Sequence, residues 1–280
     1  MQSGFKINAD KKEKTGQKLA GLYIVGTPIG NMSDITSRAI LTLENADLIL
    51  CEDSRVTGGL LHKLGIKGNM DILADYNEAE KLSAILEIMR KRSVVLVSDS
   101  GMPTISDPGF RVVRAARENN IQVFVIPGPT AFVSALVLSG FPTDRFSFLG
   151  FFKSEAALRD DNRIRHTMIY YESPSRIMDT IGVLAKVCPE RKVAIVREIT
   201  KLHEETIIGY PVDLLDIEPP RGEIVLIVDA APDVKITDNE ITEVVKSVIG
   251  MSTRDAANVL ANRTGISRKD AYERILKNGN

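Results

Sequence analysis

Between residues 19 and 142, short apolar runs alternate about five times with segments that have helical spacing. The runs have the length and the β-branched content typical of buried strands, and they span residues 22–25, 47–51, 72–73, 94–97 and 122–126. Parallel strands need a crossover connection, usually a helix, so this alternation predicts an α/β fold around a parallel sheet.

Three of these runs lead into loops rich in glycine and proline, at residues 26–31, 98–109 and 127–131. Open α/β sheets bind ligands at the carboxyl ends of their strands, where such loops meet. Glycine lets a ligand approach the backbone and proline stiffens the loop. The loop at 98–109 alone would fit a long turn equally well, but three converging loops predict a ligand site. The loop at 26–31 has neither the G-x-G-x-x-G nor the P-loop pattern, so it indicates neither a dinucleotide nor a nucleoside triphosphate. The prolines of 127–131 leave few free amides, which suits a neutral adenine or ribose edge better than an anion.

The segment after the second strand, residues 52–55, carries three charged side chains. Its position at a strand end fits the ligand edge of the sheet, but Asp53 or Ser54 would equally serve to cap the following helix. The sequence leaves both interpretations open.

The pattern changes after residue 143. Residues 144–232 hold more strand than helix, which predicts a second, mixed-sheet α+β domain after the N-terminal α/β domain at 19–143. Residues 233–280 read as a small helical extension, with Ser252 and Ser267 as N-caps and Gly265 as a helix stop. Its mixed charges favour a packing or dimerisation role over a helix-turn-helix. The Lys-rich residues 1–18 are predicted to be a disordered arm.

The composition limits the class of protein. Lys plus Arg total 36 and Asp plus Glu total 37, so no global basic charge indicates nucleic acid. The two cysteines, Cys51 and Cys188, have neither zinc nor disulfide spacing, which is typical of core residues in a reducing compartment. No apolar run has membrane-spanning length and no hydrophobic leader opens the chain. We therefore expect a soluble cytoplasmic protein with no membrane segment and no metal.

Six motifs occur in order along the chain: residues 25–31, 52–55, 98–109, 127–131, 171–176 and 197–201. As a set they resemble the tetrapyrrole methylase superfamily, and within it the members that methylate the ribose 2′-oxygen of a cytidine in the decoding region of 16S rRNA. The resemblance implies S-adenosylmethionine as cofactor in a cleft between two α/β domains, a homodimer, and 16S rRNA or the small ribosomal subunit as partner. The cofactor-binding positions carried over are Pro28, Ser100, Gly101, Met102, Pro103, Ser106, Thr130, Ala131, Tyr171, Val196 and Gly222.

A ribose hydroxyl is a poor nucleophile at neutral pH, so methyl transfer to it should use a base or a nearby cation. The candidates are Asp99 or Asp53 as proton acceptor, with Glu198 and Lys201 positioning the ribose, and Asp107 is expected to be structural. Candidate phosphate contacts are Arg55, Arg176 and Arg197. The alternatives are a methyltransferase acting on a porphyrin-like precursor and a non-catalytic RNA-binding relative.

Overall fold

The computed structural model describes residues 19–74, 76–232, 238–248, 250–264 and 267–278. The predicted arm at 1–18 and the predicted helix stop at Gly265 lie outside the described residues. The chain divides into two compact units, Met1–Ala230 and Ala231–Asn280, which are treated separately below.

The first sheet is parallel throughout and confirms the predicted alternation. Its order is β3-β2-β4-β1-β5, and its strands are β1 (Gly21–Val25), β2 (Leu48–Cys51), β3 (Met70–Ile72), β4 (Ser93–Leu96) and β5 (Val123–Ile126). The helices that follow the first four strands are α1 (Ser37–Glu44), α2 (Ser54–Leu64), α3 (Glu78–Met89) and α4 (Phe110–Glu118). This sheet and these helices are called the first lobe.

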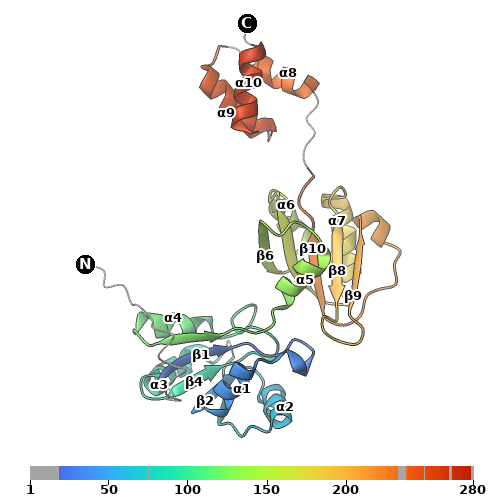
Figure 1. Ribbon diagram of the computed structural model, residues 1–280. Coiled ribbons are helices and arrows are strands. Elements are labelled where there is room, and N and C mark those ends of the chain that lie inside the picture. The colour runs from blue at the N-terminus through green and yellow to red at the C-terminus, as the bar shows by residue number, and fades with distance from the viewer. Residues whose placement is uncertain (1–18, 75, 233–237, 249, 265–266, 279–280) are drawn as a thin grey trace, which may run out of the picture. The chain divides into compact units, whose positions relative to one another are not determined.

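Helices cover both faces of the first sheet (Figure 1). Leu22, Leu50 and Leu96 pack toward α3 and α4, whereas the alternate residues Tyr23 and Ile49 pack toward α1 and α2. A strand buried on both faces needs apolar side chains at every position, which explains the continuous apolar runs in the sequence.

The second sheet is mixed, as predicted, and has the order β6-β7-β10-β8-β9. Its strands are β6 (Phe146–Phe151), β7 (Thr167–Glu172), β8 (Val193–Arg197), β9 (Glu205–Gly209) and β10 (Ile224–Val228). Only the β6–β7 pair among these neighbours is parallel. Helices α6 (Glu155–Asp161) and α7 (Ile177–Val187) pack on one face.

The other face of the second sheet is covered by α5 (Ala131–Ser139), which follows β5 of the first lobe directly. Ala135 and Leu136 of α5 pack against Ile169, Val196 and other residues of β7, β8 and β10. The second sheet with α5, α6 and α7 is called the second lobe. Because α5 begins at the strand end of one lobe and packs in the other, its first residues lie where the two lobes meet.

The unit at the C-terminal end contains helices α8 (Asp238–Ser247), α9 (Thr253–Thr264) and α10 (Arg268–Asn278). Its core includes Leu260 and Ala271. The predicted caps are confirmed, since the hydroxyl oxygens of Ser252 and Ser267 accept hydrogen bonds from the backbone amides three residues on, at 3.2 Å and 3.0 Å. Within the described residues, no helix is both long and apolar enough to span a bilayer.

Candidate functional site

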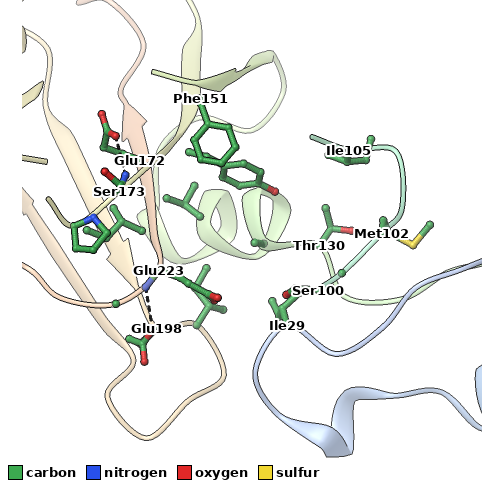
Figure 2. Close-up of a pocket in the computed structure, with 18 residues that line it drawn as sticks. Ile29, Ser100, Met102, Ile105, Thr130, Phe151, Glu172, Ser173, Glu198 and Glu223 are labelled. Atoms are coloured by element: carbon green, nitrogen blue, oxygen red, sulfur yellow. Dashed lines mark hydrogen bonds between the residues drawn. The ribbon is translucent and has the colours of Figure 1, made fainter. Parts of the chain in front are cut away.

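A cavity of about 540 Å³ opens between the two lobes, within the first compact unit (Figure 2). The first lobe lines it with residues of the loops after β1 and β4, namely Ile29, Ser100, Gly101, Met102 and Ile105. Thr130 and Ala131, at the start of α5, line it where the two lobes meet. The second lobe lines it with Phe151, Tyr171 to Pro174, Glu198 and Ile199, and Gly222 to Val225. The volume lies in the range that small-molecule and cofactor sites occupy.

Close backbone packing brings the glycine and proline loops of the first lobe together. A Cβ on Gly128 would lie 2.8 Å from the Cα of Gly26, and one on Gly26 would lie 2.6 Å from the Cα of Gly128. The amide of Thr27 donates to the carbonyl of Gly101 at 2.9 Å, and its hydroxyl donates to the carbonyl of Ser98 at 3.2 Å. The loops after β1, β4 and β5 therefore form one rigid wall, as the sequence predicted for a shared site.

The loop after β4 holds an unusual backbone. Gly101 and Gly109 have φ of 82° and 112°, and two residues with side chains, Thr104 and Ser106, have φ of 72° and 66°. Left-handed backbone at residues other than glycine costs free energy and concentrates at functional sites. This geometry presents Ser100, Gly101 and Met102 to the cavity.

Asp53, Asp99 and Asp107, which follow strands of the first lobe, do not line the cavity. The carboxylate of Asp53 caps α2 by accepting from the Arg55 amide at 2.8 Å, which confirms the capping alternative. Arg55 also pairs with this carboxylate through its side chain and lowers the pKa of Asp53 to about 2. Asp53 in turn donates its own amide to Asp99 Oδ1 at 3.2 Å.

Burial raises the pKa of two further carboxyl groups in this part of the first lobe, Asp99 and Asp107. For Asp99, the negative charge of Asp53 makes a smaller contribution in the same direction. For Asp107, burial raises the pKa to about 6, and the charges of Glu52 and Asp99 add to this shift. Carboxyl groups with a raised pKa are stronger bases than ordinary ones, which is a property of catalytic sites.

Across the cavity, Glu198 stabilises the loops that follow β8 and precede β10. Its Oε1 accepts from Lys201 Nζ at 2.9 Å and from the Glu223 amide at 3.0 Å. These donors lower the pKa of Glu198. A Cβ on Gly222, whose φ is 88°, would lie 2.4 Å from Glu198 Cδ, so the loop needs glycine there. Lys201 also reaches Glu223 Oε2 at 3.0 Å, and its side chain does not line the cavity.

A direct contact joins the loops of the two lobes beside the cavity. The amide of Asn31 donates to the hydroxyl of Thr200 at 3.1 Å. A Cβ on Gly30 would meet this hydroxyl at 2.8 Å and Lys201 Cγ at 2.7 Å. Thr200 itself has a left-handed φ of 67°. The contact ties the loop that carries Ile29 to the loop that carries Glu198.

The β7 end supplies the remaining wall. Burial raises the pKa of Tyr171 to about 12, so its phenol stays protonated at neutral pH. The buried carboxylate of Glu172 accepts from the Ser173 amide at 2.7 Å and from the Thr180 hydroxyl at 2.6 Å. It also pairs with Arg176 at 2.7 Å, which orients that half-exposed guanidinium at the start of α7.

The structure brings seven of the eleven carried-over cofactor positions and one of the four catalytic candidates to the cavity. The cofactor positions that line it are Ser100, Gly101, Met102, Thr130, Ala131, Tyr171 and Gly222, and the catalytic candidate is Glu198. Those that do not are Pro28, Pro103, Ser106 and Val196 among the cofactor positions, and Asp53, Asp99 and Lys201 among the proposed catalytic ones. Val196 is fully buried and packs toward α5, while Pro28 and Ser106 each adjoin a lining residue.

The three arginines differ in their surroundings. The Arg55 side chain is 90% exposed beside its partner Asp53. Arg197 donates from Nε to the Arg221 carbonyl at 2.7 Å and from Nη1 to Glu205 at 2.9 Å, so these donors stabilise the fold.

Among the described residues, none of the histidine, cysteine and acidic side chains gather into a group of three that could hold a metal ion.

Several lining residues were not predicted: Ile29, Ile105, Phe151, Glu172, Ser173, Pro174, Ile199, Glu223, Ile224 and Val225. Five of these ten directly follow or precede a predicted position, and Ser173 and Pro174 lie within the motif at 171–176. The motifs therefore located the loops but not the side chains that face inward. Phe151 is different, since only an apolar strand was evident around it.

The chain matches the family model of the Tetrapyrrole (Corrin/Porphyrin) Methylases over residues 21–211. Its fold is also similar to the crystal structure of uroporphyrin-III C-methyltransferase from Thermus thermophilus complexed with S-adenosyl homocysteine. That likeness has a TM-score of 0.53 and 20% identity, and it covers 75% of this chain and 97% of that one. The family match covers more than half of the chain, so the chain belongs to the tetrapyrrole methylase family. The structural likeness agrees with its fold of one parallel-sheet lobe and one mixed-sheet lobe.

Similarity is stronger to proteins named ribosomal RNA small subunit methyltransferase I. The protein of that name from Haemophilus influenzae is 39% identical over 269 residues, which is 90% of this chain and 95% of that protein. The one from a Hydrogenobaculum species is 44% identical over 217 residues, covering 74% of this chain and 94% of that protein. The chain therefore lies in the branch of the family that carries this name.

Proposed function

We propose that this chain is an S-adenosylmethionine-dependent methyltransferase that acts on the ribose 2′-oxygen of a cytidine in the decoding region of 16S rRNA. The observation that carries the proposal is the cavity between the lobes, lined by the motif loops of a chain 39% identical to a named rRNA methyltransferase over 90% of its length. We further propose that it acts in the cytoplasm as a homodimer on 16S rRNA or on the small subunit.

The residues present fit the cofactor. The cavity of about 540 Å³ combines exposed backbone at Gly101 and Gly222, both of which have a left-handed φ, with apolar contacts from Ile29 and Met102. Hydroxyl groups of Ser100 and Thr130 lie on the same walls. The residues proposed to hold the cofactor are Ser100, Gly101, Met102, Thr130, Ala131, Tyr171 and Gly222, supported by Pro28, Pro103, Ser106 and Val196. When bound, S-adenosylmethionine supplies an electrophilic methyl group on a sulfonium.

Asp99 is our candidate proton acceptor for the ribose hydroxyl. It directly precedes the lining residue Ser100, its pKa is raised by burial, and the Asp53 amide orients its carboxylate. Asp53 is committed to its helix cap and to Arg55, so its role is to support Asp99. An Asp99→Asn variant should bind cofactor normally and lose most methyl transfer in a single turnover, and full transfer would refute the assignment.

Glu198 and Lys201 are proposed to shape the wall that receives the ribose. Their ion pair fixes the loop after β8. The lowered pKa of Glu198 keeps this carboxylate ionised and makes it a weaker base than an ordinary glutamate. Arg55 and Arg176 are proposed phosphate contacts, because both side chains are exposed at the starts of helices α2 and α7. Arg197 contributes through the fold around Glu205 and Arg221.

Nucleoside mass spectrometry of 16S rRNA from cells with and without this protein tests the proposal. The account expects a 2′-O-methylated cytidine that disappears with the protein and returns when it is restored. A change in a tetrapyrrole pool with unchanged rRNA would favour the alternative substrate. Cofactor binding without any transfer would favour a non-catalytic relative.

A further inference from the structure

Phe151 is a large aromatic residue that lines the cavity and yet stays 52% exposed. It ends β6, which is the edge strand of the second sheet. Figure 2 shows its ring on the side of the second lobe, with Ile105 across from it on the loop of the first lobe. An exposed aromatic ring at a pocket has unburied apolar faces that a flat ligand can cover.

A bulge in β6 places this ring. Phe148 pairs with Ile169 of β7, and Phe151 pairs with Tyr171, so β6 uses one residue more than β7 between these two points. Gly150 takes up the extra residue with a left-handed φ of 71°. A bulge of this kind re-aims the side chains that follow it, and a shift by one residue exchanges the two faces of a strand.

The neighbouring side chains confirm this exchange of faces. Leu149 and Phe152 pack on the side of α6 and α7, whereas Phe148 packs on the side of α5. Regular alternation from Phe148 would send residue 151 to the α6 and α7 side. The bulge brings Phe151 instead to the face of Tyr171, which lines the cavity.

Aromatic contacts hold the ring from behind. Phe151 meets Tyr171 edge-on, with ring centroids 5.5 Å apart and an interplanar angle of 64°. Tyr171 in turn packs edge-on against Phe148 at 4.9 Å, and Phe148 stacks on Phe132 of α5 at 4.5 Å. This chain of rings fixes Phe151 from one side and leaves the rest of the ring open.

We propose that Phe151 is a stacking platform for an unpaired nucleobase of the RNA substrate. Every base has a flat apolar face, and aromatic side chains bind unstacked RNA bases in this way. Its half-exposed position on the cavity wall suits a group that arrives with a large substrate from solvent. The adenine of the cofactor would instead need polar partners for its edge, and the labelled side chain across from Phe151 in Figure 2 is the apolar Ile105.

The inference rests on the proposed function, because it takes the substrate to be RNA. The variants are Phe151→Leu, which keeps apolar volume without a flat ring, and Phe151→Trp, which restores a ring. Phe146→Leu is the matched control, since Phe146 lies on the same strand, is 42% exposed and does not line the cavity. The measurements are KM and kcat for 16S rRNA in small subunits and the affinity for S-adenosylhomocysteine by calorimetry.

Phe151→Leu should raise KM for the RNA roughly tenfold with kcat and S-adenosylhomocysteine affinity unchanged. Phe151→Trp should restore KM, and Phe146→Leu should behave as wild type. Unchanged KM in Phe151→Leu would overturn the proposal. So would a parallel loss of S-adenosylhomocysteine affinity, since the ring would then contact the cofactor.

A second measurement keeps the two proposals separate. If the wild-type protein transfers no methyl group to RNA, the proposed function fails while the platform can still be tested. The fluorescence of a purine analogue in a short single-stranded RNA should be quenched by the wild type and not by Phe151→Leu. Equal quenching by both proteins, or none by the wild type, would overturn the platform itself.

Discussion

Gly128→Ala is the substitution that most directly tests how the first lobe builds its wall. The added Cβ would lie 2.8 Å from the Cα of Gly26, 2.9 Å from its carbonyl carbon and 3.0 Å from its carbonyl oxygen. All three atoms belong to backbone at the end of β1, so no side chain can rotate away to make room. The loops after β1 and β5 must separate, and such overpacking costs about 1–3 kcal/mol.

The displaced segment leads directly to Thr130 and Ala131, which line the cavity. We therefore expect Gly128→Ala to lower the free energy of unfolding by about 1–3 kcal/mol and to weaken S-adenosylhomocysteine binding by about tenfold. The φ of Gly128 is not in the left-handed region, so any loss of stability comes from steric overlap of the added Cβ rather than from backbone strain.

Urea unfolding and titration calorimetry measure the two quantities. Gly59→Ala is the matched control, because Gly59 lies in α2 and its added Cβ would meet no atom within 4 Å outside its chain neighbours and the backbone of its own helix. This exposed helical glycine should gain about 0.5–1 kcal/mol on becoming alanine, with unchanged ligand affinity. Wild-type stability and wild-type affinity in Gly128→Ala would refute the account of the wall.

Three further changes are expected to have distinct signatures. The pKa of Asp107 in the folded protein, about 6, lies above its usual 3.8, so the free energy of unfolding should fall as the pH rises between these two values. Thermal unfolding should find Asp107→Asn more stable than the wild type at neutral pH. This difference should vanish at a pH below 3.8. Thr200→Val removes the hydroxyl that accepts from Asn31 and should weaken S-adenosylhomocysteine binding about fivefold, with Thr200→Ser restoring it; equal affinities would show that this contact does not hold the walls. Arg55→Ala should reduce the slope of log affinity for RNA against log salt by about 1, and an unchanged slope would remove Arg55 from the interface.

The sequence predicted structure best where a physical requirement produces a regular residue pattern or a fixed residue spacing. Strands such as 22–25 and 48–51 are buried on both faces, so their continuous apolar runs were visible and predicted the parallel sheet. The caps at Ser252 and Ser267 were visible because the capping oxygen and its partner have a fixed spacing. The packing of α5 against the second sheet was not visible, since a helix that is apolar on nearly all sides does not reveal which lobe it covers.

The candidate site was predicted at the level of loops. The motifs located the walls because glycine and proline are required where backbones meet, as at Gly26 and Gly128. The inward-facing side chain within each loop depends on register and on local backbone, which the sequence does not show. Phe151 is the clearest case, because a bulge at Gly150 determines which face it occupies.

The central claim is that this cavity carries a methyl donor whose methyl group reaches a ribose of 16S rRNA. The most direct test supplies the purified protein with small ribosomal subunits and S-adenosylmethionine that bears a deuterated methyl group. Mass spectrometry of the digested RNA should then find the deuterated methyl on the ribose of a cytidine, with Gly128→Ala reducing its amount. A deuterated methyl on a base, on another nucleoside or on no RNA at all would contradict the account.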